Sequence, residues 1–259
     1  MRLTFLGTGT SFGIPQVGCE CAVCHSADPR DRRTRCSAAI EVDGRTILID
    51  TAPELRLQLL AAKITRVDAV LYTHSHADHV NGIDDLRIFS ARQADAPLVC
   101  YGPADALDQI RSGFRYIFDE AQPFAGTSKP RLALHPLIAG VTTRIAGVPV
   151  LPLAFTHGFV QVFGYRIGPV AYITDAKAVP EAARQQLAGI KLLVLNALWW
   201  RPHPTHLSID EAVVTAQAIG APQTYFTHLT HETGHAELAA RLPAGIAPAY
   251  DGLTIEVTA

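Results

Sequence analysis

Residues 73–79 place four potential metal ligands within six positions, in the sequence Thr-His-Ser-His-Ala-Asp-His. His74 and His76 lie two residues apart and can share one metal ion if the backbone there is extended. Asp78 and His79 follow where the chain turns into a helix, so they can face a second ion. Imidazole and carboxylate ligands together suit Zn²⁺, Mn²⁺ or iron. This density of ligands predicts a site for two divalent metal ions, in preference to a solvated polar turn.

Three further potential ligands, His157, Asp175 and His228, each follow an apolar, strand-like stretch. Taken alone, His157 also fits a hydrogen-bonded core histidine, and Asp175 also fits a helix cap. In layered α/β folds, however, rigid strands aim side chains into one crevice at their ends. We therefore expect these residues to join the 73–79 segment in a single site. Two cations held there would ionise a bridging water near neutral pH and neutralise phosphate oxygens, which predicts hydrolysis by a metal-bridging hydroxide.

A second cluster of ligands lies near the N-terminus, where Cys19, Cys21 and Cys24 fall within six residues. They are too close together for an ordinary disulfide framework, and in a reducing compartment this spacing is typical of metal thiolates. A closed tetrahedral zinc site needs one more ligand. His231, near the other end of the chain, can supply it. His25, directly after Cys24, is the alternative, although adjacent ligands are geometrically awkward.

The elements that must position these residues alternate between extended and helical patterns along the chain, and no linker or repeat divides it. Asp43-Gly44 is a two-residue hairpin signal between two strand-like runs. Cys36 and Cys100 lie in or beside such runs, so we expect them to be buried as small hydrophobes. We expect strands at residues 3–6, 38–42, 46–49, 68–72, 98–101, 148–155, 170–173, 192–195 and 224–226, and helices at about 53–62, 83–92, 180–187 and 209–219.

The composition limits the classes of protein to which this chain can belong. Apolar residues make up 48% of the 259 positions, but no apolar run is long enough to span a bilayer, so we expect no membrane insertion. Neither a long apolar signal segment nor a cleavage site follows Met1, which predicts a cytoplasmic protein. The net charge of −2 gives no positive field for long nucleic acids and favours a small anionic substrate. We expect one domain over residues 1–259, with a zinc-binding loop at about 18–36.

The pattern His-x-His-x-Asp-His, followed by the later histidines and aspartate, resembles that of the metallo-β-lactamase superfamily. The resemblance implies an α/β fold, a four-layer αββα sandwich with a dinuclear Zn or Mn site between the sheets. It also implies a division of the ligands. One metal takes His74, His76 and His157, the other takes Asp78, His79 and His228, and Asp175 bridges the two.

The Cys-x-Cys-x-x-Cys loop and the later Thr-His-x-x-His at residues 227–231 form a more specific pattern. They resemble the PhnP-type phosphodiesterases, whose best-known activity opens a phosphoribosyl 1,2-cyclic phosphate, and the resemblance extends over residues 5–252. It implies a structural zinc held by the three cysteines and His231. It also implies that His206, which precedes a helix, is the general acid that protonates the leaving oxygen, with Asp78 to orient it. Related proteins are often homodimers.

Arginines give weaker signals of substrate binding. Four arginines lie between positions 30 and 35, after the Cys loop. Arg87 lies just past the start of the helix expected after residues 73–79. Guanidinium forks suit phosphate oxygens. A solvated surface or pairing with a carboxylate explains each of them equally well. Arg87 is the candidate for substrate binding.

Together these features predict a metal-dependent hydrolase that cleaves a small phosphodiester, such as a cyclic one. One alternative is RNA 3′-end processing, as in tRNase Z, although the sequence shows neither the extended basic arm nor the positive charge of that family. A second is a non-hydrolytic protein similar to the pyrroloquinoline-quinone biosynthesis protein. Members of that kind have degraded catalytic ligands, whereas all seven are present here. The third alternative is a purely structural metal-binding module.

Overall fold

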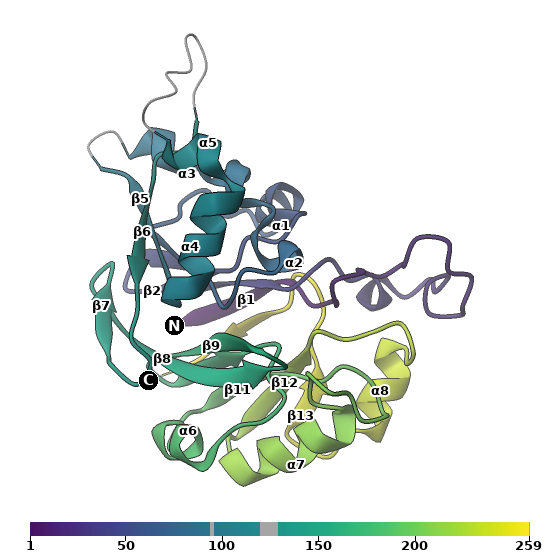
Figure 1. Cartoon of the computed structure of the whole chain (residues 1–259). Helices are drawn as coiled ribbons and strands as arrows, with labels where there is room; N and C mark the ends of the chain where they lie inside the picture. The colour runs from purple at the N-terminus through teal and green to yellow at the C-terminus, as the bar shows by residue number, and fades with distance from the viewer. Residues whose placement is uncertain (94–95, 120–128, 259) are drawn as a thin grey trace.

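Two seven-stranded sheets pack face to face in the computed structural model, which describes residues 1–93, 96–119 and 129–258 (Figure 1). Helices cover the outer face of each sheet, so the layers follow the order helix, sheet, sheet, helix. This is the four-layer architecture that the sequence predicts. Within the described residues, no helix is both long and apolar enough to cross a bilayer.

The first sheet has the strand order β14-β1-β2-β3-β4-β5-β6. Its strands are β1 (Arg2–Gly7), β2 (Ser37–Val42), β3 (Arg45–Ile49), β4 (Ala69–Leu71), β5 (Leu98–Gly102), β6 (Leu132–Pro136) and β14 (Thr254–Glu256). Strands β3 to β6 run parallel, and the remaining neighbours are antiparallel. Asp43 and Gly44 join β2 to β3 with φ values of 50° and 71°. Two positive φ angles fit the tight hairpin turn expected from this pair.

The second sheet has the order β13-β12-β11-β10-β9-β8-β7. Its strands are β7 (Thr143–Ile145), β8 (Val148–His157), β9 (Val160–Ile167), β10 (Val170–Ile173), β11 (Leu192–Asn196), β12 (Gln223–Thr227) and β13 (Ile246–Pro248). Strands β7 to β10 form an antiparallel meander, and β10 to β13 run parallel. In this sheet, β7, β9 and β13 are not among the strands expected from the sequence. Gly164 interrupts the apolar pattern of β9. The position is occupied by glycine because a Cβ there would lie only 2.7 Å from the Phe155 ring.

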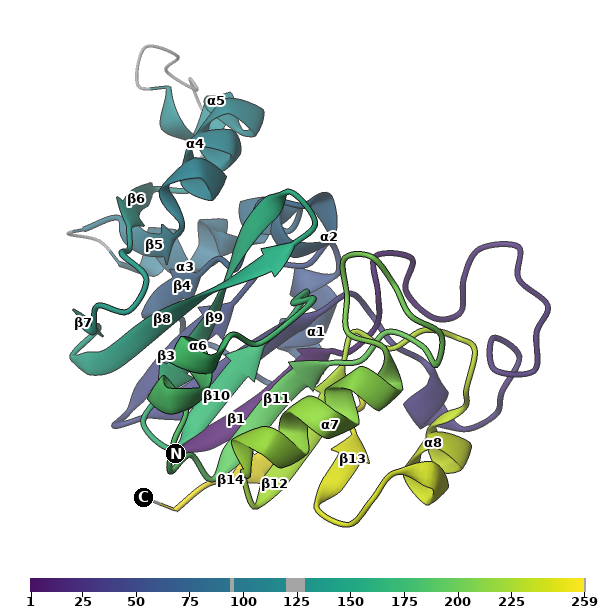
Figure 2. The same cartoon turned by 60° about the horizontal axis from the view of Figure 1, so that its bottom comes forward.

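The helices lie on the two outer faces of the sandwich (Figure 1). They are α1 (Leu55–Ala61), α2 (Ala77–Val80), α3 (Arg87–Arg92), α4 (Ala104–Gly113), α5 (Arg115–Phe118), α6 (Glu181–Gln186), α7 (Ile209–Ile219) and α8 (His235–Arg241), with 3₁₀ turns η1 (Pro29–Asp31) and η2 (Ile83–Leu86). The helix expected at 83–92 is therefore split into η2 and α3. Figure 2 shows α7 across the outer face of the second sheet. A capping box of Ser208 and Glu211 begins α7, and Gly220 ends it at φ 74°.

Apolar side chains fill three separate layers of the core. One cluster lies between the sheets and joins Phe5 of the first sheet to Tyr165 and Val194 of the second. Leu193 belongs instead to the cluster under α6 and α7, because neighbouring side chains of a strand point to opposite faces. Leu48 belongs to the third cluster, under the helices of the first sheet. Both sheets are thus buried on two faces, which makes their strand ends rigid supports for a site.

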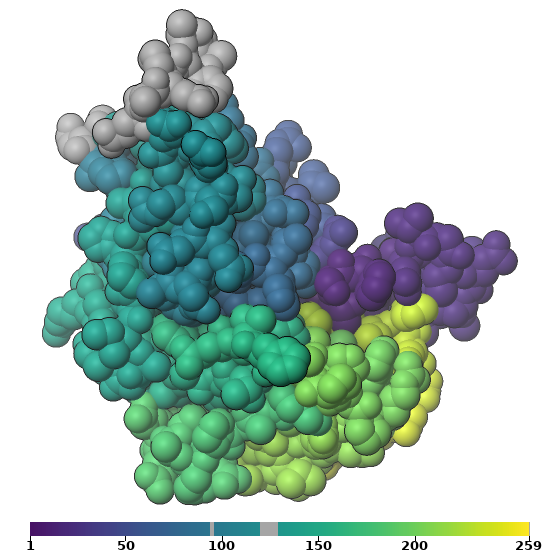
Figure 3. All heavy atoms as spheres, viewed as in Figure 1, coloured from purple at the N-terminus to yellow at the C-terminus, as the bar shows by residue number. Residues whose placement is uncertain are grey.

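A long loop, residues 8–36, connects β1 to β2 and projects from the side of the sandwich (Figure 1). In the space-filling view it forms a separate lobe that meets C-terminal segments along its lower side (Figure 3). The loop contains the cysteine cluster.

Candidate metal centre

The seven predicted ligands meet at one edge of the sandwich, although they come from four separate strand ends. β4 leads into residues 73–79, where His76 is still extended at φ −62° and ψ 148° before α2 begins. His157 is the last residue of β8. Asp175 follows β10, and His228 directly follows β12. Four strands therefore deliver side chains to one place, as the sequence pattern predicts.

The ligand atoms form overlapping groups, and within each group all atoms lie within 4.8 Å of one another. The first group is His74, His76 and His157, the second is Asp78, His79 and His228, and the third is His74, His79 and Asp175. Asp175 therefore lies between the other two groups. The first two groups contain the residues of the two implied ligand sets, and Asp175 lies close to His74 of one set and His79 of the other, while the bridging role of Asp175 stays a prediction.

Left-handed backbone turns aim three of the acidic and imidazole groups into the centre. Asp50, Asp175 and His228 have φ values of 60°, 58° and 57°, and each follows a strand directly or within two residues. Such a conformation costs a non-glycine residue about 1–3 kcal/mol, so surrounding contacts must hold it. At Asp175 the Asn196 side chain supplies them, because it bonds both to the N–H and to the carbonyl of Ala176 at 2.8 and 3.0 Å.

Unpartnered imidazole nitrogens show that these residues fit a metal. Nδ1 of His79 donates to Oδ2 of Asp50 at 2.7 Å, so the neutral form of the ring carries its lone pair on Nε2, where a cation would take the place of a proton. Among the described residues, the buried Nε2 atom of His74 has no hydrogen-bond partner. Those of His79 and His228 make no hydrogen bond either, but they lie 3.3 and 3.1 Å from the carboxylate of Asp175. A buried polar atom without a partner destabilises a fold, and a bound cation removes that cost.

The charges of the centre also favour a bound cation. Side-chain exposure is 0% for Asp50, 3% for Asp175 and 13% for Asp78. Burial raises the pKa of Asp175, but the neighbouring His228 and His79 outweigh that effect and hold the pKa well below its ordinary value. Burial lowers the pKa of His79, and Asp175 and Asp50 outweigh it and raise that pKa well above its ordinary value. Buried carboxylates at this density are stable only beside positive charge.

Asp50 is a site residue that the sequence analysis missed. Its carboxylate accepts from the N–H and the hydroxyl of Thr73, each at 2.8 Å, and from Nδ1 of His79 at 2.7 Å. It thereby fixes the backbone just before the ligand segment and the ring orientation of His79. The available signal was the strand-like run Ile47–Ile49 that ends in this acid, the same pattern that identified Asp175.

His206 lies at the edge of the centre. Its Nε2 is 2.9 Å from Oδ1 of Asp175, and its ring stacks against His228 with centroids 4.9 Å apart. Within the described part of the chain, Asp175 is the carboxylate in hydrogen-bonding distance of His206. The family resemblance implies Asp78 in that position, but Asp78 lies at His79 and His228 instead.

The segment that carries His206 is itself held against the centre. Nδ1 of His206 lies 2.9 Å from the hydroxyl of Thr205 and 3.1 Å from Nδ1 of His203. The carbonyl of Thr205 accepts from Nδ1 of His157 at 3.1 Å, which turns Nε2 of His157 toward the ligand group. One short segment thus orients both a predicted ligand and the predicted acid.

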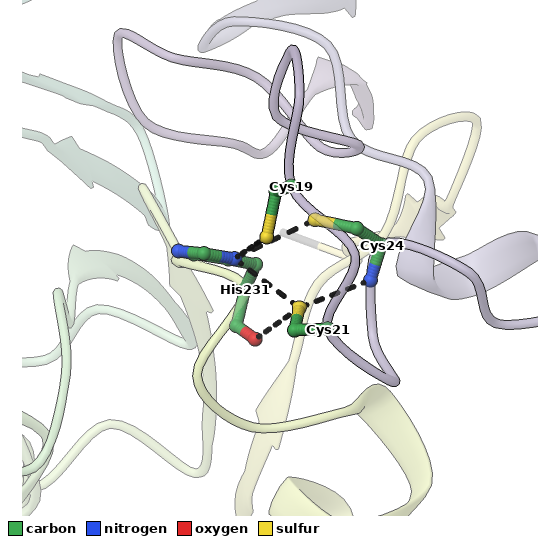
Figure 4. A group of neighbouring side chains, drawn as sticks. All are labelled: Cys19, Cys21, Cys24 and His231. Carbon is green, nitrogen blue, oxygen red and sulfur yellow. Dashed lines mark hydrogen bonds between the residues drawn. The ribbon is translucent and has the colours of Figure 1, made fainter.

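The cysteine cluster converges on one nitrogen of His231 (Figure 4). Nδ1 of His231 lies 3.2, 3.3 and 3.5 Å from the sulfurs of Cys19, Cys21 and Cys24. The backbone N–H of Cys24 donates to Cys21, and this bond is the main reason why the pKa of the Cys21 thiol falls to about 6. The four ligand atoms are close enough for one tetrahedral ion. The alternative ligand, His25, is exposed and outside this group.

The basic cluster that follows the cysteines anchors the loop. Arg33 is buried, and its guanidinium donates to the Thr8 hydroxyl at 2.9 Å and to the Ala249 carbonyl. Asp31 accepts from the backbone N–H of His235 at 2.6 Å. The bonds to Ala249 and His235 join the loop to the C-terminal part of the chain rather than to the metal centre, and the bond to Thr8 closes the loop on itself.

Arg87 does not join the centre either. Its guanidinium pairs with Asp84 at 2.7 Å. It lines a cavity of about 520 Å³ beside α1 and α3, and among the described residues that line this cavity there is no predicted ligand. The predicted contact of Arg87 with a substrate at the metal centre therefore has no support in the structure.

Cys36 and Cys100 are buried at 1% and 0% exposure, as expected for structural cysteines.

Comparison with known proteins identifies the family. Residues 45–229 match the family model of the beta-lactamase superfamily domain. A crystal structure described as a new diphosphatase from the PhnP family superimposes with a TM-score of 0.91 and 39% sequence identity, over 99% of this chain and 98% of that one. The chain belongs to the PhnP family of the beta-lactamase superfamily. Its fold is that of a family of metal-dependent hydrolases, and this fold implies divalent metals in the centre described above.

Two other relatives cover most of the chain. An octanoyltransferase of Porphyromonas gingivalis is 41% identical over 256 residues, which are 98% of this chain and 51% of that protein. The chain therefore spans about half the length of that relative. Coenzyme PQQ synthesis protein B of Xanthomonas oryzae pv. oryzae is 26% identical over 305 residues, which are 98% of this chain and 99% of that protein.

Replacing His231 with alanine should remove one zinc equivalent per chain, because the three thiolates then lack their fourth ligand. The matched His25→Ala change should leave the zinc content unaltered, because His25 lies outside the cluster. Elemental analysis of protein purified without chelator measures both. Loss of the same equivalent in His25→Ala, and its retention in His231→Ala, would reverse the assignment.

Asp50→Asn should lower metal affinity at the main centre by about 10- to 100-fold, since an amide cannot accept all three bonds that orient Thr73 and His79. Competition with a fluorescent chelator measures this change. Asp108→Asn, at an exposed aspartate of α4, is the control and should bind metal like the wild type. Equal affinities in all three proteins would show that Asp50 does not support the centre.

Proposed function

We propose that this chain hydrolyses a small phosphodiester at the metal centre. The observation that carries the proposal is the convergence of seven metal-ligand side chains with His206 directly beside them. The likeness to the PhnP-family diphosphatase supports phosphorus–oxygen bond cleavage as the reaction type. The expected partner is a small phosphorylated molecule.

The ligand groups define what the chain's own residues do. His74, His76 and His157 would hold one cation, Asp78, His79 and His228 would hold the other, and Asp175 would contact both. Divalent cations supply ionisation of water near neutral pH and stabilisation of charge on phosphate oxygens. The protein fixes their positions through buried bonds to the ligands, such as that from His79 to Asp50.

His206 is the proposed proton donor to the leaving oxygen. Its Nε2 atom faces the centre, 2.9 Å from Asp175, while Thr205 and His203 hold the opposite nitrogen. A donor in this position is needed most when the leaving group is a poor one, such as an alkoxide. The group of His157, Asp175 and His206 also has ligand spacing, so His206 has a competing role as a metal ligand.

The cysteine cluster is proposed to bind a structural zinc. Its fourth ligand, His231, lies three residues beyond His228, so the zinc would also hold the segment that delivers His228 to the centre.

A second candidate function is hydrolysis of a diphosphate linkage. It is favoured by the description of the 39% identical PhnP-family structure as a diphosphatase. A phosphodiester is an ester and a diphosphate linkage is an anhydride. In both, the centre would stabilise negative charge on the oxygens of the phosphate that is attacked. RNA processing has less support, because the human tRNase Z structure is only 19% identical and shows likeness of fold alone. The PqqB structure from Methylobacterium extorquens is 20% identical and likewise shows likeness of fold alone.

The metal-loaded enzyme should hydrolyse bis-p-nitrophenyl phosphate in the presence of Mn²⁺ or Zn²⁺, and Asp78→Ala should abolish this turnover. His206→Ala should lower kcat by about 10²- to 10⁴-fold on a dialkyl phosphodiester. The loss on the p-nitrophenyl ester should be much smaller, because p-nitrophenolate leaves without a proton. Absorbance and ³¹P NMR measure the two rates.

Metal content separates the two roles of His206. A proton donor can be removed without loss of metal, so His206→Ala should keep the wild-type metal content. Equal rate losses on both esters together with metal loss would identify His206 as a ligand instead. Turnover of inorganic pyrophosphate, with no turnover of any phosphodiester, would favour the second candidate function.

A further inference from the structure

We propose that a cavity beside the cysteine cluster binds the planar, uncharged ring of the substrate, and that this ring is a nucleobase. The inference rests on the proposed function, because it concerns the organic group attached to the reacting phosphate. The cavity has a volume of about 230 Å³. Three segments that lie far apart in the sequence line it, namely residues 10–16, 199–201 and 230–232.

A row of aromatic rings connects this cavity to the metal centre. Trp199, which lines the cavity, lies 5.2 Å from His203 between ring centroids, and His203 lies 5.0 Å from His206. His206 in turn lies 4.9 Å from His228. The cavity therefore lies within three ring contacts of the metal centre, and the proposed substrate would place its phosphate at the centre and its organic group in the cavity.

The charges that line the cavity are already paired. The guanidinium of Arg201 lies 2.5 Å from the carboxylate of Glu232 and 4.1 Å from the centre of the Trp199 ring. Both charged residues line the cavity, so their paired charges leave little attraction for a second phosphate. An uncharged group fits this lining better than an anionic one.

The cavity also offers surfaces on which a flat ring can stack. Phe12 lines it and is 67% exposed. A turn presents this ring, since the N–H of Gly13 bonds to the Thr10 carbonyl at 2.9 Å and Gly13 has a φ of 67°. Bases stack on aromatic rings and on arginine planes, and this cavity offers the exposed ring of Phe12 together with Arg201, whose guanidinium already covers one face of Trp199.

The volume of the cavity and its polar lining residues fit a single heterocyclic ring. Pockets for whole drug-sized ligands measure about 300–1,000 Å³, so a cavity of about 230 Å³ takes part of a substrate. Gln16, Thr10 and Thr230 also line it. Their amide and hydroxyl groups can bond to the nitrogen and oxygen atoms at the edge of a base. A plain hydrocarbon ring would leave these groups unused.

Tryptophan fluorescence tests the inference directly, because the chain has only two tryptophans, Trp199 and Trp200. Trp200→Phe leaves Trp199 as the reporter in the metal-loaded protein. Adenosine 5′-monophosphate should then quench the fluorescence, and ribose 5-phosphate, which lacks the base, should not. Adding Phe12→Ala should weaken binding of the nucleotide about tenfold, in line with the loss of one stacking surface.

Phe159→Ala is the matched control, since Phe159 is fully exposed but does not line the cavity. It should leave nucleotide binding unchanged. If the Trp200→Phe protein fails to fold, calorimetric titration of the wild type and of Phe12→Ala gives the same comparison. Equal quenching by ribose 5-phosphate, or no effect of Phe12→Ala, would overturn the inference. Binding is measured without turnover, so failure of the proposed phosphodiesterase activity would be seen separately.

Discussion

The arrangement of this protein depends on the burial of three carboxylates, Asp50, Asp78 and Asp175, among imidazoles at the strand ends. Buried negative charge is strongly unfavourable unless positive charge lies beside it. The imidazoles provide only part of that charge, and the buried Nε2 atom of His74, which has no hydrogen-bond partner, points to a cation as the remainder. The two sheets make this possible, because their doubly covered strands can hold strained turns at Asp175 and at similar strand ends.

The projecting loop adds the cysteine cluster and one wall of a cavity to the region around this centre. The thiols of residues 19–24 meet His231, so the loop after β1 is tied to the segment after β12. Buried Arg33 and Asp31 add bonds to the C-terminal region and fix the loop a second time. The same two segments form walls of the cavity that contains Phe12. A structural zinc would therefore stabilise both the delivery of His228 and the shape of the neighbouring cavity.

Much of the centre could be predicted from the sequence, because each ligand follows an apolar strand-like run and strand ends converge in this kind of fold. The remainder depends on tertiary contacts. The left-handed turn at Asp175 has no glycine to mark it, and its stability comes from Asn196, which lies twenty-one residues later. The pairing of His206 with Asp175 rather than Asp78 likewise depends on how two loops meet. From the sequence, the arginines after the cysteines fit phosphate binding and a structural role equally well, and Arg33 is buried and bonded to Thr8 and Ala249.

Anomalous X-ray diffraction from crystals grown with Mn²⁺ tests the central claim most directly. Two peaks should lie in the crevice at the strand ends, one beside the group that contains His76 and one beside the group that contains Asp78, with Asp175 touching both. A centre without bound metal, or with a single ion away from Asp175, would contradict the account.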